Sequence, residues 1–209
     1  MSAAKTAHVD VVDLRRKVLA NTRACWCSFV AWDQLSRSRD QSDVASLFYL
    51  TKWQFLPFES GLFVDVLIRM VVLFDDKERD QVSFHAYRAV DKSLPKVDPK
   101  YDDAIRRIRC IRHNAVAHWN SQQNVSGWLE KFQLSITDVE SALACIRELH
   151  DFLLALEHAK PPDTFAILEI GTRKKIDEFI EVLRDAARFK LVDAPARYQA
   201  NARYEAANP

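Results

Sequence analysis

The chain has 209 residues, enough for one well-packed domain and too few for two of ordinary size. Apolar residues make up 48% and charged residues 28%, and there are only three glycines. The sequence has no alternating β-branched runs between turn signals, which argues against a sheet-rich fold. The formal net charge of +1 also lacks the strong basic excess of many nucleic-acid-binding domains. We therefore expect an all-α protein.

The spacing of apolar residues predicts a first helix over about 9–36 and a second helical region over about 44–74. Pro57 lies inside the second region and either kinks one helix or opens a new one. Ser83 is placed to cap a short helix that runs through Val90.

The pair Asp98-Pro99 predicts the start of another helix, because aspartate caps helix N-termini and proline is favoured at the first helical position. We expect this helix over about 100–119. Its apolar residues are spaced to line one buried face: Ala104, Ile105, Ile108, Ile111, Ala115 and Val116.

Residues 121–135 are polar and irregular and predict a loop. Thr137 and Glu140 match a capping box at the start of a helix that ends before Pro161. A last helix is expected from Thr172 to about 189.

These elements predict one domain over 9–190, an antiparallel bundle of about five to six helices. Residues 1–8 are expected to form an N-terminal tail. Residues 191–209 lack apolar periodicity and are expected to form a mobile C-terminal tail.

The four cysteines do not have the spacing of a disulfide framework or a metal site. Cys110 and Cys145 fall among apolar helical positions, where a free thiol packs as a small hydrophobe. The first residues lack the apolar core of a signal peptide, and the apolar run 61–74 is too short and polar to cross a bilayer. We expect a reduced, cytoplasmic protein without a membrane segment, a metal or a cofactor.

The strongest chemical signal is a cluster of basic residues on the helix expected over 100–119. It consists of Arg106, Arg107, Arg109 and Arg112, followed by His113, Asn114 and His118. Arginine can stabilise a charged phosphorus intermediate, and histidine can move a proton near neutral pH. Arg112 and His118 could thus cleave RNA without a metal, with Asn114 orienting the histidine ring.

Residues six apart on an ideal helix are rotated by roughly 240°, so Arg112 and His118 do not stack on one face. Either the helix ends or unwinds near His118, or a symmetric dimer shares the site. A plain surface role is the competing interpretation of this pair. Core packing is likewise the simpler interpretation of the tryptophans at 26, 32, 53, 119 and 128, although such rings can stack on bases.

The segment from Arg112 to His118 resembles the Arg-x4-6-His motif of HEPN domains. The context, including Leu73-Phe74-Asp75 and the short helix after Ser83, resembles the abortive-infection branch of that superfamily over roughly 10–160. Five residues separate arginine and histidine here, whereas four are frequent in the family.

The resemblance implies that the chain folds as a helical bundle and forms a dimer. It also implies that the chain is a metal-independent endoribonuclease that leaves 2′,3′-cyclic phosphate ends. Arg112 and His118 would be the catalytic pair, and Asn114 or His113 the auxiliary polar residue. Arg106 and Arg109 would extend an RNA-binding stripe. An antitoxin protein is a further implied partner, in a toxin–antitoxin or phage-defence setting. The alternative is a non-catalytic module that binds RNA, a nucleotide or a protein partner. A third possibility is that His118 only caps the end of its helix.

Overall fold

The computed structural model describes residues 10–39, 52–76, 82–111, 129–130, 133–157 and 163–207, with the backbone alone at 39, 52–57 and 186–207. The described part is all-α, as predicted, and contains no strand. Its helices are α1 (Val11–Arg39), α3 (Lys52–Leu73), α4 (Phe84–Val90), the 3₁₀ helix η1 (Pro99–Tyr101), α5 (Asp102–Cys110), α8 (Ile136–Ala155) and α9 (Thr164–Ala207). None of the helices searched in these ranges is long and apolar enough to span a membrane.

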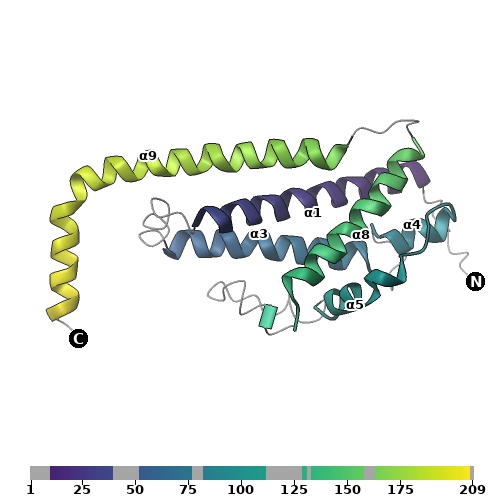
Figure 1. Ribbon diagram of the computed structural model, residues 1–209, viewed down its shortest axis with the longest axis horizontal. Helices are drawn as coiled ribbons and strands as arrows, with labels where there is room; N and C mark the ends of the chain where they lie inside the picture. Colours follow the sequence, from purple (N-terminus) through teal and green to yellow (C-terminus); the bar gives the residue numbers. More distant parts are fainter. Residues whose placement is uncertain are drawn as a thin grey trace, which may run out of the picture.

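Helix α1 is the central element, because it contacts α3, α4, α8 and α9 (Figure 1). It runs antiparallel to α3: Ser36 near its end bonds Glu59, whereas Arg69 near the end of α3 bonds Asn21. It is also antiparallel to α8, which crosses it at an angle (Figure 1). The antiparallel helical bundle predicted from the sequence is therefore present around α1.

Helix α9 lies along another side of α1 and runs in the same direction (Figure 1). The aromatic ring of Phe165 meets Trp26 edge-on, with ring centroids 4.9 Å apart. Further along, Ile180 packs against Leu35, and Arg173 forms an ion pair with Asp33. Beyond this contact α9 continues past the bundle and bends toward its C-terminal end (Figure 1).

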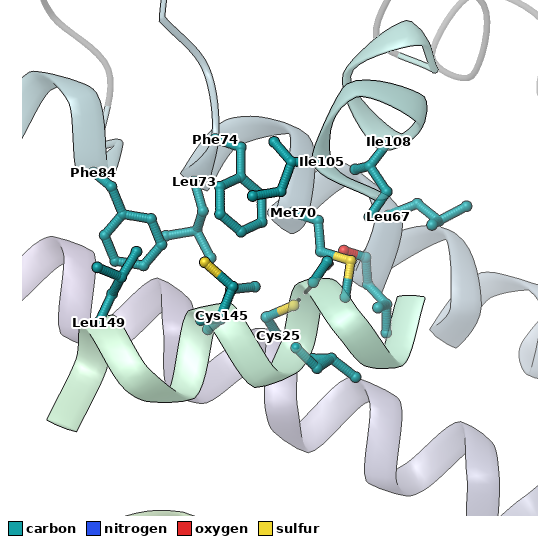
Figure 2. Packing of buried hydrophobic residues seen from close by; sticks show 14 of the residues in the cluster. Cys25, Leu67, Met70, Leu73, Phe74, Phe84, Ile105, Ile108, Cys145 and Leu149 are labelled. Atoms are coloured by element: carbon teal, nitrogen blue, oxygen red, sulfur yellow. Dashed lines mark hydrogen bonds between the residues drawn. The ribbon is translucent and has the colours of Figure 1, made fainter. Parts of the chain in front are cut away.

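One hydrophobic core joins α1, α3, α4, α5 and α8. Figure 2 shows side chains of α1, α3, α4, α5 and α8 meeting in it, among them Met70 from α3, Ile108 from α5 and Cys145 from α8. The buried tryptophan ring of Trp32 lies 4.7 Å from that of Phe63. Core packing is thus the role of Trp32 and, partly, of Trp26, while Trp119 and Trp128 lie outside the described residues.

The helix starts predicted at Ser83 and Asp98 are confirmed. The Ser83 hydroxyl accepts a hydrogen bond from the Ala86 amide at 3.0 Å, and α4 ends at Val90. The Asp98 carboxylate accepts one from the Lys100 amide, also at 3.0 Å, and η1 then leads directly into α5. Helix α3 begins at Lys52 and passes through Pro57 rather than restarting there.

The predicted capping box at Thr137 and Glu140 is wrong, because the box lies two residues earlier. Ser135 is the N-cap of α8: its hydroxyl accepts from the Asp138 amide at 3.1 Å, and its own amide donates to the Asp138 carboxylate at 2.9 Å. Aspartate, shorter than glutamate, closes the same reciprocal pair from the third helical position.

The predicted bounds of the last helix, Thr172 and 189, are also wrong. Helix α9 begins at Thr164 because Asp163 caps it, with its carboxylate 3.0 Å from the Ala166 amide. It then continues through Gly171, whose site is open and costs only a modest loss of helix propensity. The backbone of the expected C-terminal tail is helical as far as Ala207. Its many alanines favour a helix even without an apolar face.

The buried face predicted for the Arg/His helix is confirmed where the structure describes it. Ala104, Ile105, Ile108 and Ile111 are buried, whereas Ala115 and Val116 lie outside the described residues. The expectation for Cys110 is wrong: it is exposed, because it lies on the opposite side of α5 from this apolar face. Cys145 is buried, as predicted.

Candidate functional site

The predicted catalytic residues Arg112 and His118, and the auxiliary candidates His113 and Asn114, lie outside the described residues. The structure does describe α5, the helix that precedes them in the chain, and with it the predicted RNA-binding residues Arg106 and Arg109. The described part of the candidate site therefore consists of α5 and the surface around it.

Three independent contacts fix the position of α5. At its start, the Asp98 carboxylate acts as a cap by accepting a hydrogen bond from the Lys100 amide. This hydrogen bond lowers the pKa of the Asp98 carboxyl. Its apolar face is held in the core by Ile105 and Ile108. Its outer side is tied to α8 by Arg107, whose Nη1 lies 3.0 Å from an oxygen of Asp138. The segment that follows α5 therefore starts from a well-anchored helix.

The carboxylate of Asp138 on α8 is the group that Arg107 of α5 binds. Burial alone would raise the pKa of its carboxyl, but hydrogen bonds from the Ser135 amide and hydroxyl and from Arg107 lower it overall. The carboxylate is therefore held in its charged form by the same groups that cap α8 and position α5. Arg107 is consequently part of the scaffold and not a free cation.

The two predicted RNA-binding arginines have different surroundings. Arg106 is 73% exposed, and within the part of the chain that the structure describes its ion pair is with the similarly exposed Asp103, one turn earlier on α5. Arg109 is half-buried and forms an ion pair with Asp76, which follows the end of α3. Because exposed pairs contribute little stability, a phosphate could displace Asp103 from Arg106 at small cost. Arg109 is already held by the protein.

A cavity of about 300 Å³ opens beside Arg109. Its described lining comes from the end of α3, from α4, from the segment 94–97, from α5 and from one residue of α8. The apolar lining residues are Leu73, Phe74, Phe84, Leu94, Pro95, Val97, Ile105 and Leu149, and the charged or titratable ones are Asp76, His85, Arg88, Asp102 and Arg109. A cavity of this volume that combines apolar and charged side chains is large enough to hold a small ligand.

Asp76, His85 and Arg88 belong to this cavity but were not singled out from the sequence as site residues. A usable signal exists for two of them. His85 and Arg88 are three residues apart on the helix capped by Ser83, and this spacing places both on one side of it. Asp76 could not have been found in this way, because its pairing with Arg109 joins residues far apart in the chain.

The remaining described histidine has a structural role. His150 is fully buried on α8, where its ring meets Phe165 edge-on at 4.5 Å and accepts a long hydrogen bond from Arg23. Burial lowers its pKa. Among the residues that the structure describes, no cluster of His, Cys, Asp or Glu is arranged to hold a metal ion.

Comparison of the chain with protein-family models, with curated proteins and with solved structures finds no match.

Proposed function

We propose that the chain is a metal-independent endoribonuclease of HEPN type, acting in a toxin–antitoxin or phage-defence setting on RNA and leaving 2′,3′-cyclic phosphate ends. In this proposal His118 transfers the proton and Arg112 stabilises the charged phosphorus intermediate. Asn114 or His113 is the auxiliary residue. The proposal rests first on the sequence motif from Arg112 to His118.

The anchoring of α5 is the structural observation that supports it. A ribonuclease must hold its reacting groups in a fixed geometry, and this is easier on a rigid helix than on a loosely held segment. The Asp98 cap, the buried isoleucines and the pair between Arg107 and Asp138 fix the helix that leads into Arg112. Arg106, on the same helix, offers an exposed cation whose weak ion pair can exchange for a phosphate.

The second candidate is a non-catalytic module of the same bundle. The observation in its favour is that all three arginines described on α5 are paired with a carboxylate: Arg106 with Asp103, Arg107 with Asp138 and Arg109 with Asp76. These pairs reduce the positive potential that would attract RNA. The two candidates therefore differ in whether chemistry occurs, and a cleavage assay separates them.

The test is cleavage of mixed RNA by purified protein in EDTA. We expect the wild type to produce fragments with 2′,3′-cyclic phosphate ends and the His118→Ala variant to lose at least about 100-fold in rate, as for removal of a general acid–base group. The Arg112→Gln variant should lose a similar amount, because it removes charge stabilisation.

His158→Ala is the matched control, since this histidine lies far in the sequence from the motif between Arg112 and His118. It should cleave at the wild-type rate. A folded wild type that leaves all RNA intact, or a His118→Ala variant that cleaves normally, would contradict the proposed chemistry and leave the non-catalytic module as the better account.

A further inference from the structure

The cavity beside α5 is lined by apolar and charged side chains from four helices, α3, α4, α5 and α8, and from the segment 94–97. Figure 2 shows five of these side chains from α3, α4, α5 and α8 close together: Leu73, Phe74, Phe84, Ile105 and Leu149. The rings of Phe74 and Phe84 lie 5.8 Å apart and are tilted by 50°. Both rings are largely buried in the core, at 6% and 4% exposure, so they offer a small apolar area to the cavity, enough for a small apolar group.

The charged residues of the cavity are not equivalent. Arg109 is paired with Asp76. Arg88 is half-buried on α4, lines the same cavity, and has no ion pair with any of the described residues. His85, three residues earlier on α4, adds a second nitrogen-bearing side chain on the same side of that helix. Arg88 is thus the cation best placed to meet a ligand.

We infer that this cavity binds a small amphipathic organic anion, with its apolar body against Phe74 and Phe84 and its single carboxylate or phosphate group at Arg88. The guanidinium fork of arginine matches either of these groups. A site of about 300 Å³ is at the lower end of the range for small-molecule sites and fits a ligand of modest size.

A discrete anion fits the cavity better than a stretch of RNA. Two carboxylates, Asp76 and Asp102, line it beside two arginines, and Asp76 is paired with Arg109, so little net positive charge is left to attract a polymer that carries a phosphate at every nucleotide. A ligand with one anionic group can point that group at Arg88, away from the carboxylates. This ligand site is therefore separate from the proposed ribonuclease chemistry.

The test is calorimetric titration of the full chain, without RNA, with three probes of one shape. 3-Phenylpropionate carries a carboxylate, phenethyl phosphate carries a phosphate, and 3-phenylpropanol is uncharged. We expect at least one anion to bind with a Kd of about 1 mM or tighter, and the alcohol to bind at least about tenfold more weakly. The anion that binds more tightly identifies the preferred head group.

Three variants locate the site. Arg88→Gln should weaken binding of the anion at least about tenfold while leaving the weak binding of the alcohol unchanged. Val97→Phe should weaken all probes, because it fills the cavity. Arg37→Gln removes an exposed arginine near the far end of α1 and should bind like the wild type.

Failure of both anions to bind the folded wild type would overturn the inference, and so would equal binding by the wild type and Arg88→Gln. Neither result depends on RNA cleavage, so the ribonuclease proposal is tested separately.

Discussion

Arg107 Nη1 on α5 lies 3.0 Å from both carboxylate oxygens of Asp138 on α8. The same carboxylate accepts hydrogen bonds from the Ser135 amide at 2.9 Å and from the Ser135 hydroxyl at 2.7 Å. A single side chain therefore completes the capping box of α8 and also holds α5, the helix that carries the three described arginines of the basic cluster. The capping of α8 and the position of α5 are therefore energetically linked through the Asp138 carboxylate.

Replacing this carboxylate should destabilise the fold. Asp138→Ala removes the carboxylate half of the α8 capping box, so that only the Ser135 hydroxyl still caps the helix, and it leaves Arg107 without its partner. We expect a loss of about 1–2 kcal/mol in the free energy of unfolding. Urea denaturation measures it. Asp103→Ala, which removes an exposed partner of Arg106, should change stability by less than about 0.5 kcal/mol. Equal effects of the two variants would contradict the role given to Asp138.

The contribution of Asp138 should also depend on pH. Its folded-state pKa is lowered below the ordinary value of 3.8, so its charged form stabilises the fold at neutral pH. This contribution should be lost as the pH falls below about 4 and through the folded-state pKa. The difference in stability between wild type and Asp138→Asn should therefore shrink in acid. A difference that stays constant down to the acid transition would exclude this linkage.

Phe165 should be the residue that holds α9 to the bundle. Its side chain is fully buried at the start of α9 and contacts the rings of both Trp26 and His150. Phe165→Ala should lower the free energy of unfolding by about 3–5 kcal/mol, because it opens a cavity between helices. Ile167→Ala, at a largely exposed site on the same helix, should cost less than about 1 kcal/mol. Similar losses for the two would show that α9 does not depend on this contact.

His150 should make stability fall in mildly acidic solution. Its folded-state pKa lies below the ordinary value of 6.5, chiefly because it is buried, with Arg23 adding to the effect and Asp151 opposing it. The unfolded chain therefore binds a proton first, and stability is lost as the pH falls from about 6.5 toward the folded-state pKa. In His150→Phe the free energy of unfolding should change less between pH 7 and pH 5. A His150→Phe profile identical to the wild type would refute the assignment.

The sequence predicted the elements of the fold well where local signals decide them. Ser83 and Asp98 capped the helices they were expected to cap, because each lies directly before an apolar helical pattern. The buried face of α5 followed from its three- and four-residue spacing. Errors arose where two local signals competed, as with Thr137 and the true cap at Ser135, or where alanines extended a helix without an apolar face, as beyond residue 189 in α9.

The cavity could not be predicted from the sequence, because its lining comes from segments that only the tertiary fold brings together. The pairing of Arg109 with Asp76 is of this kind. It also changes the interpretation of the basic cluster. The stripe expected from Arg106, Arg109 and Arg112 assumed unpaired cations, whereas Arg106, Arg107 and Arg109, the three arginines that the structure describes, each have a carboxylate partner. Sequence spacing gives the position of a charge on a helix but not the charge that faces it.

The cysteines should differ sharply in reactivity with an aromatic disulfide reagent at pH 8. Burial raises the pKa of Cys145 to about 12 and raises that of Cys25 strongly as well, so both thiols stay protonated and covered. Cys110 is exposed on α5 and should react within seconds to minutes. Cys110→Ser should remove the fastest phase. A fast phase that survives this substitution would place the reactive thiol elsewhere, with the half-buried Cys27 as the next candidate.

Arg106 should contribute one phosphate contact if the protein binds RNA as proposed. It is the most exposed of the three described arginines on α5, and its pair with Asp103 is weak enough to exchange. Arg106→Gln should reduce the slope of log affinity against log salt by about 0.7–0.9, the counterion release expected for one phosphate contact. Arg16→Gln provides the control, since it removes an equally exposed, ion-paired arginine from α1, away from α5. Fluorescence anisotropy with a labelled RNA, titrated at several salt concentrations, measures both slopes. If the salt slope of Arg106→Gln equals that of the wild type, RNA does not contact this side of α5. If Arg16→Gln reduces the slope as much as Arg106→Gln does, the binding is nonspecific attraction to any surface cation.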